Sequence, residues 1–144
     1  MDDLERFIMP QEINYKFALR EMKAGRKQSH WIWFIFPQLR GLGPSRKSEI
    51  YGIKDIDEAK NYLAHPVLGK RLIEITETIL SLSTNDPFDL MASEIDAIKL
   101  KSSMTLFALA SGEEDSIFHK VLEKFFGGEM DGETINLIKK LKQH

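Results

Sequence analysis

Cysteine is absent from the 144 residues of this chain. Disulfides, thiolate zinc sites, iron–sulfur clusters and catalytic thiols are therefore excluded, because each of them needs the cysteine sulfur. The chain also lacks an excess of positive charge, since 20 Lys and Arg side chains stand against 22 Asp and Glu for a net charge of -2. Dedicated nucleic-acid binders usually carry a clear basic excess, so we do not expect nucleic acid as a partner.

Long apolar runs are missing as well. No stretch approaches the roughly 18 to 20 apolar residues that a membrane-spanning helix needs, and the first five residues are acidic where a secretory signal is basic. We therefore expect a cytoplasmic protein without a membrane partner. The four histidines are scattered along the chain without the spacing of metal ligands, so the sequence predicts no metal site and no cofactor.

What the chain does contain is the pattern of a mainly α protein. Its apolar fraction of 42% and charged fraction of 29% are ordinary for a globular domain. Apolar residues recur at helical spacing, and Ser, Asp and Gly occupy the positions of helix caps. We expect one compact domain over residues 1–144 with about six to eight helices, the clearest at 10–24, 55–64, 66–82, 93–110, 117–125 and 131–141.

Two connecting segments are less regular. Residues 30–36 are almost continuously apolar and aromatic, which is typical of a buried strand or of a short buried helix. A lone strand has no pairing partner in a helical chain, so we favour a helical turn or an irregular buried segment that ends at Pro37. Residues 41–45 then form a predicted loop, and Ser45 suits the cap of a short helix ending at Tyr51. Residues 83–87 are also predicted as a loop.

The richest chemistry lies in residues 25–43, which hold both tryptophans beside a basic lead-in. Aromatic faces next to cations suit a planar ligand with anionic groups, and a helix capped by Ser29 would attract phosphate to its N-terminus. The alternative is that the cations complement the preceding helix dipole, Ser29 is an ordinary cap, the glycines make a tight turn and the aromatic residues are core. Composition alone favours this alternative. The candidate ligand-binding residues are Arg26, Lys27, Ser29, His30, Trp31, Trp33, Gln38, Gly41 and Gly43.

A second group of polar residues lies on the predicted helix after Ser93. Residues 96, 99 and 103 fall within about 60° of one another on a helix, beside its apolar stripe. A half-buried carboxylate, ammonium and hydroxyl are suited to acid–base chemistry or to anchoring a ligand. The alternative, an ordinary surface Asp–Lys pair, is favoured by composition alone. We take Asp96 and Lys99 as candidate catalytic residues and Ser103 as a candidate ligand-binding residue.

Unusual strings along the whole chain carry a family resemblance. They are Arg26–Gly43, Tyr51–Ile53, Tyr62–Gly69 with Arg71 and Leu72, Lys99–Phe107, and Asp131 with Thr134. The chain resembles the bacterial domain of unknown function 1810 family, which implies a single, mostly helical domain and no established activity. It departs from the usual family pattern at Pro10, where alanine is frequent, and at 91–93, where glycine is frequent.

A looser similarity concerns the NADAR group of YbiA-like proteins. The helical layout and the Lys-x-x-x-x-Met-x-x-Phe pattern starting at Lys99 are similar to that group, whose members are linked to NAD and ADP-ribose metabolism and cleave N-glycosidic bonds. This similarity implies a YbiA-like architecture and a ligand related to a nucleotide.

Together these patterns predict an enzyme that hydrolyses a nucleotide-like or ADP-ribose-like N-glycoside. In this interpretation Trp31, Trp33 or Phe36 stacks a base. Arg26, Lys27 and the 41–43 turn receive phosphate or ribose. Asp96 with Lys99 positions water or stabilises the leaving group. Two alternatives stay open: a non-catalytic module that binds a nucleotide or a protein, and a function on an unrelated surface with the aromatic segment entirely in the core.

Overall fold

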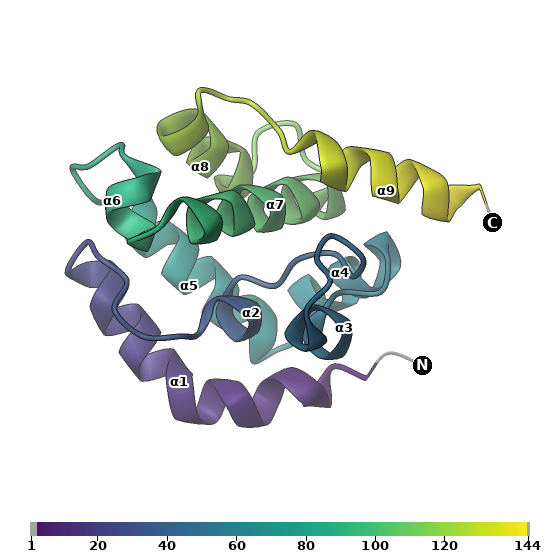
Figure 1. Cartoon of the computed structure of the whole chain (residues 1–144), viewed down its shortest axis with the longest axis horizontal. Coiled ribbons are helices and arrows are strands. Elements are labelled where there is room, and N and C mark those ends of the chain that lie inside the picture. Colours follow the sequence, from purple (N-terminus) through teal and green to yellow (C-terminus); the bar gives the residue numbers. More distant parts are fainter. Residues whose placement is uncertain (1–2, 144) are drawn as a thin grey trace.

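Nine helices and no strand make up the described part of the chain, residues 3–143, in the computed structural model (Figure 1). The mainly α fold is confirmed. In the segments that connect the helices, Leu39 and Ile53 form an isolated parallel β-bridge. The helices are α1 (Glu5–Lys23), α2 (Ile32–Ile35), α3 (Arg46–Tyr51), α4 (Ile56–Ala64), α5 (Leu68–Leu80), α6 (Pro87–Met91), α7 (Glu94–Ser111), α8 (Ile117–Phe126) and α9 (Gly132–Lys142).

The predicted caps occupy the ends of these helices. The Asp55 carboxylate accepts from the Glu58 N–H at 2.8 Å, and the Ser93 hydroxyl accepts from the Asp96 N–H at 3.0 Å. Each cap satisfies a backbone donor that has no partner inside its helix. Gly25 follows α1 with φ +85°, a left-handed conformation that glycine adopts without strain. Local chemistry therefore sets most of the helix boundaries.

Two boundaries differ from the prediction. Helix α1 begins at Glu5 rather than at Pro10, so the proline lies inside the helix. Its missing N–H breaks one helical hydrogen bond, and Figure 1 shows α1 bent along its length, as an interior proline favours. The loop predicted at 83–87 ends in α6, because Asp86 caps a short helix with Pro87 at its first position.

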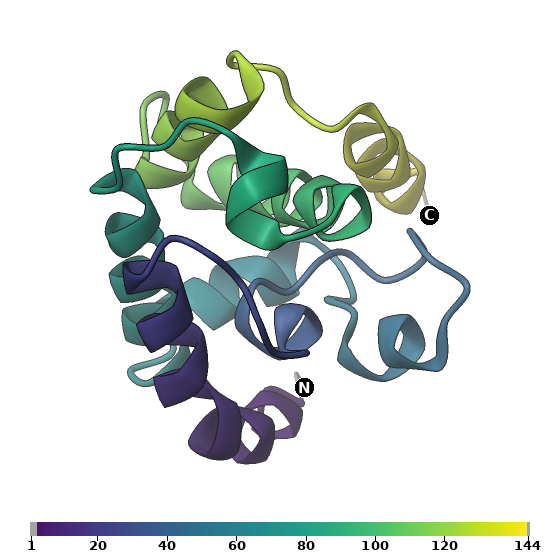
Figure 2. The same cartoon turned by 60° about the vertical axis from the view of Figure 1, so that its left-hand side comes forward.

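Helix α7 lies at the centre of the fold. It packs against α2, α4, α6, α8 and α9, while α5 packs against α1, α4 and α8 (Figures 1 and 2). The predicted stripe of Leu100, Met104 and Phe107 is fully buried. Ser102, Ser103 and Thr105 are buried as well, since neighbours cover α7 on several sides. The buried apolar residues form one core cluster, so the described chain is a single domain.

The aromatic segment is a helical turn, as favoured above. Helix α2 packs against both α1 and α7 (Figure 2), and Phe36 just after it is fully buried. Trp31 is 1% exposed and Trp33 is 7% exposed. Both tryptophans are therefore mainly packing residues, and only a small part of each is accessible.

Candidate ligand-binding and catalytic site

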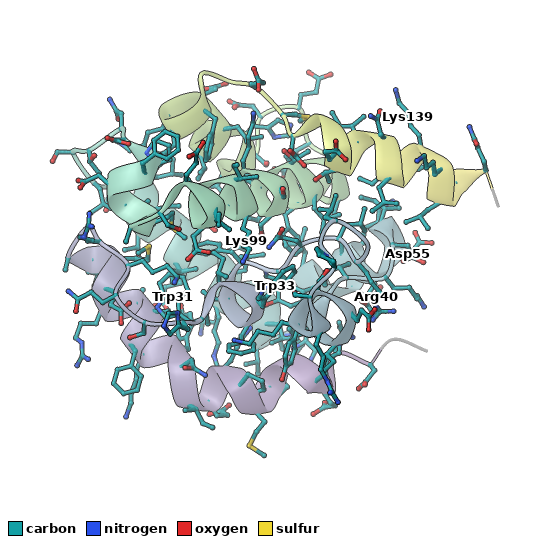
Figure 3. All side chains as sticks on the ribbon, viewed as in Figure 1. Trp31, Trp33, Arg40, Asp55, Lys99 and Lys139 are labelled. Carbon is teal, nitrogen blue, oxygen red and sulfur yellow. The ribbon has the colours of Figure 1, made fainter. Side chains whose placement is uncertain are left out.

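A cavity of about 280 Å³ lies where the loop between α1 and α2 meets the start of α7. We call it the lysine compartment. It contains the candidate catalytic residues Asp96 and Lys99 together with part of the 25–43 segment, and Figure 3 shows Lys99 next to Trp33 between α7 and α2. Its lining residues are Lys27, His30, Trp31, Ile32, Trp33, Phe34, Ser45, Lys47, Asp96 and Lys99.

The Asp96 carboxylate joins the two sides of this compartment. Because Ser93 caps α7, Asp96 falls in the first turn of the helix, where the helix dipole favours a negative charge. One carboxylate oxygen lies 2.9 Å from the Lys27 ammonium, and the other lies 3.7 Å from the Lys99 ammonium. Asp96 remains 18% exposed at its side chain. It therefore holds two cations and still reaches the cavity.

The two lysines also face the tryptophans. The Lys27 ammonium lies 5.2 Å from the Trp31 ring centroid, and the Lys99 ammonium lies 5.2 Å from the Trp33 ring centroid. These distances suit cation–π attraction. Lys27 is only 6% exposed, so it needs a counter-charge, which Asp96 supplies. Its backbone N–H donates to the Leu90 carbonyl at 2.7 Å, which fixes the loop against α6.

Glu21 of α1 holds the loop that carries these residues. One carboxylate oxygen accepts from the Gln28 N–H at 2.7 Å, the Ser29 N–H at 2.8 Å and the Trp31 indole N–H at 2.9 Å. The other accepts from the Ser29 hydroxyl at 2.7 Å. Burial raises the pKa of Glu21, but these hydrogen bonds outweigh burial and lower it to about 2. The four donors to this buried carboxylate are neutral groups, and their hydrogen bonds hold the loop between α1 and α2 in place.

Glu21 is not among the residues predicted from the sequence for this region. A usable signal was present, because Glu21 lies between Ala18 and Met22 of the apolar stripe, on a face that the helical spacing predicts to be buried. A buried acid needs donors, and the nearest following loop holds the donors in Gln28, Ser29 and Trp31. Which donors reach the carboxylate depends on the path of the loop, and the helical pattern does not specify that path.

The predicted phosphate site at a helix capped by Ser29 is wrong. Helix α2 has four residues and its N-cap is Trp31, which makes no side-chain cap. The Ser29 hydroxyl donates to Glu21 instead. Arg26 also lies apart from the lysine compartment, because it is 56% exposed and pairs with Asp89 at 3.1 Å on the surface next to α6.

Gln38 and Gly43 line a second cavity, of about 230 Å³, which we call the apolar compartment. It shares Trp33 and Lys99 with the lysine compartment, and its other lining residues are Leu42, Ile95, Ile98, Ser102, Asp131 and Glu133. Gly41 and Ser103 are not among the lining residues of either compartment. Gly41 turns the chain with φ +102° beside Leu137, and Ser103 is fully buried inside α7.

A larger hollow, of about 780 Å³, lies on the surface along α5 and includes His65 and Glu74. None of the candidate residues lines it. The His65 Nδ1 atom accepts from the N–H groups of Val67 and Leu68 at 3.1 and 3.2 Å, so the imidazole caps the start of α5. The candidate residues that do line a cavity line the two smaller ones; they are Lys27, His30, Trp31, Trp33, Gln38, Gly43, Asp96 and Lys99.

Metal-binding groups and membrane-spanning helices are both absent from residues 3–143. No group of three or more His, Asp or Glu side chains within this range could hold a metal ion. Within the same range, no helix has both the length and the apolar character required to cross a membrane.

Comparisons with known proteins extend over almost the whole chain. The structure is similar to the crystal structure of the conserved hypothetical protein Rv1873 from Mycobacterium tuberculosis, with a TM-score of 0.90 and 42% sequence identity over 95% of this chain and 96% of that chain. A search of curated proteins gave no significant match. The family model described as protein of unknown function (DUF1810) matches residues 1–138. By this match, and in agreement with the resemblance of its sequence strings, the chain belongs to the DUF1810 family.

Proposed function

We propose that this protein binds a nucleotide-like or ADP-ribose-like ligand in the lysine compartment and hydrolyses its N-glycosidic bond. The observation that carries the proposal is the position of Asp96, whose carboxylate lies 2.9 Å from Lys27 in a cavity that also contains Trp33 and Lys99. Lys27 and Asp96 come from different segments of the chain, and the tertiary structure brings them together.

The charge of the lysine compartment favours an anionic ligand. Three lysines, Lys27, Lys47 and Lys99, face the cavity against one carboxylate, that of Asp96. Lysine ammoniums bind phosphate as point charges. Trp33, which lines the cavity, offers an apolar surface for a planar group. A phosphorylated ribose with an attached base combines these features.

Asp96 and Lys99 can together carry out the hydrolysis of an N-glycoside. Asp96 accepts a proton from a water molecule, whose oxygen attacks the anomeric carbon. The bond between that carbon and the base nitrogen breaks, and its electron pair leaves with the nitrogen. Lys99 stabilises that nitrogen or donates a proton to it. The carboxylate also stabilises the positive charge that develops on the sugar in the transition state.

A second candidate function is a binding module without catalysis. The observation in its favour is that both Asp96 oxygens face lysine ammoniums, at 2.9 and 3.7 Å, as in a carboxylate whose role is to neutralise buried cations. The hydrolytic function has in its favour the looser resemblance to the NADAR group, which rests on the sequence pattern starting at Lys99 and on the predicted helical layout.

The test begins with thermal shifts in the presence of NAD, ADP-ribose and nucleosides at millimolar concentration. A ligand at a hundred times its dissociation constant stabilises the folded state by about 2.7 kcal/mol. We expect at least one of them to stabilise the protein, and chromatography then measures release of the free base. Absence of any shift contradicts the hydrolytic function and the binding of a nucleotide, and leaves a protein as the ligand of the binding module.

Asp96→Asn decides between the two candidates. The asparagine preserves the size of the side chain and a carbonyl oxygen toward Lys27, but it cannot accept the proton from water. We expect base release to fall by a factor on the order of 10² to 10⁴ while the ligand-induced thermal shift persists. Asp89→Asn is the matched control, because Asp89 is 61% exposed and pairs with Arg26 outside the cavity. Equal turnover by Asp96→Asn and wild type contradicts the hydrolytic role, and binding without turnover by the wild type supports the binding module.

A further inference from the structure

The apolar compartment adjoins the lysine compartment through the same two side chains. Trp33 and Lys99 line both cavities, which measure about 230 and 280 Å³. Pockets for small molecules usually span roughly 300 to 1,000 Å³, so each cavity by itself falls below that range and the two together fall within it. A ligand with two parts can therefore occupy both, with its connecting bond beside Trp33 and Lys99.

Gln38 gives the apolar compartment a polar group of its own. The residue is 3% exposed, it lines the cavity, and its Nε2 atom has no hydrogen-bond partner within the described residues. The backbone at Gln38 is fixed, because its carbonyl accepts from the Ile53 N–H at 2.8 Å. A buried amide without a partner is costly to maintain. A ligand carbonyl oxygen in this cavity would supply the acceptor that Nε2 lacks.

The remaining walls define the shape and charge that the cavity accepts. Ile95 and Ile98 of α7 line it and are 67% and 52% exposed, so they form an apolar rim that a flat ring would cover. The carboxylates of Asp131 and Glu133 also line it, against the single cation of Lys99. This balance disfavours an anionic group here, whereas the lysine compartment favours one.

From these observations we infer that the apolar compartment binds the base of the proposed ligand, and that this base is a planar, neutral or cationic heterocycle bearing a carbonyl oxygen that accepts a hydrogen bond from Gln38. The inference rests on the proposed function and names its leaving group by chemical class. It places the N-glycosidic bond at the boundary of the two compartments, beside Lys99, with the phosphorylated ribose toward Lys27 and Lys47.

Free heterocycles test the base site without requiring turnover. Nicotinamide and 3-methylpyridine share a ring and differ in the carboxamide, and each is titrated into ¹⁵N-labelled protein while the side-chain amide signals of Gln38 are followed by NMR. We expect nicotinamide at millimolar concentration to shift the Gln38 signals and to bind about tenfold more tightly than 3-methylpyridine. Equal affinities, or unchanged Gln38 signals at saturation, would overturn the inference.

Gln38→Met separates a ligand contact from a structural role. We expect the preference for nicotinamide over 3-methylpyridine to disappear while the melting temperature stays the same or rises, because the variant removes an unpaired buried amide. Gln28→Met is the matched control, since the Gln28 side chain is exposed and outside both compartments. A preference that survives in Gln38→Met contradicts the inference, as does a loss of stability that explains the change in binding.

Ile98→Ser tests the apolar rim independently. It should weaken the binding of both heterocycles, whereas Leu109→Ser, at a 39% exposed position of the same helix, should leave both unchanged.

The experiments distinguish failure of the base site from failure of the hydrolytic function. Base release from a nucleotide with no response at Gln38 contradicts the base site alone. A shift of the Gln38 signals by nicotinamide in a protein that cleaves nothing retains the base site and contradicts the hydrolytic function.

Discussion

Glu21→Ala is expected to lower the free energy of unfolding by about 3 to 5 kcal/mol. The substitution removes the acceptor of four donors: the N–H groups of Gln28 and Ser29, the Ser29 hydroxyl and the Trp31 indole N–H. Hydrogen bonds to a charged group are stronger than neutral ones, and donors left unpaired in a buried position add their desolvation cost. Urea denaturation followed by tryptophan fluorescence measures the change.

The control for this substitution is Glu123→Ala on the exposed face of α8. It should change the free energy of unfolding by less than about 0.5 kcal/mol, as is usual for surface positions. A loss of similar size in both variants would contradict the role assigned to Glu21. Loss of the fixed Trp31 environment should also shift the tryptophan emission of Glu21→Ala, and Glu123→Ala should retain the native spectrum.

Because of the Glu21 carboxylate, we also expect the free energy of unfolding to decrease at acidic pH. The pKa of Glu21 is lowered from its ordinary value of 4.5 to about 2, so the folded state binds the proton less readily than the unfolded chain. Its contribution is complete above the unfolded pKa and is lost as the pH falls toward 2. A shift of this size corresponds to about 3 kcal/mol. Glu21→Gln should lack this part of the acid dependence, and parallel losses in variant and wild type between about pH 5 and 2 would contradict it.

A second large loss of stability is expected for Gly69→Ala. A Cβ atom at this position in α5 would lie 2.8 Å from the carbonyl carbon of Leu63 and closer still to its oxygen, with the Tyr62 oxygen at 3.2 Å. Backbone atoms cannot move aside as a flexible side chain can, so α4 and α5 would have to separate. We expect the free energy of unfolding to fall by at least about 3 kcal/mol.

Gly132→Ala provides the comparison within the same chain. An added Cβ at Gly132, the first residue of α9, meets none of the described atoms within 4 Å. Because alanine restricts the unfolded chain more than glycine does, stability should stay unchanged or rise by about 0.4 to 1 kcal/mol. Similar stabilities of the two variants in urea denaturation would show that α4 and α5 do not depend on the close approach at Gly69.

Short-range rules were sufficient for the helical part of the fold. Asp55 and Ser93 accept from the residue three positions later, and Gly25 adopts the left-handed conformation that ends α1. These interactions involve neighbours in the chain, so they can be read from spacing. Pro10 and α6 are exceptions, because the rest of α1 continues the helix through a proline and tertiary contacts such as that of Lys27 with Leu90 support the short helix.

For the candidate site, the sequence predicted which types of residue take part, but not which of them lie in contact. Asp96 and Lys99 share one helix face, which helical geometry predicts, and the structure adds a distance between them of 3.7 Å. The pairing of Lys27 with Asp96 joins positions far apart in sequence, so local spacing carries no information about it. Ser29 shows the converse, since its hydroxyl suits a cap by composition but donates to Glu21 in the folded chain.

The sequence by itself therefore determined a mainly α domain, its principal helix boundaries and its family, because backbone hydrogen bonding and helical periodicity act over a few residues. Only the tertiary structure decided that Lys27 meets Asp96, that Glu21 binds the loop before α2, and that Trp33 and Lys99 line two adjoining cavities. The physical reason is that burial and pairing of polar groups depend on which helix faces pack together, and packing couples residues without regard to their separation in the chain.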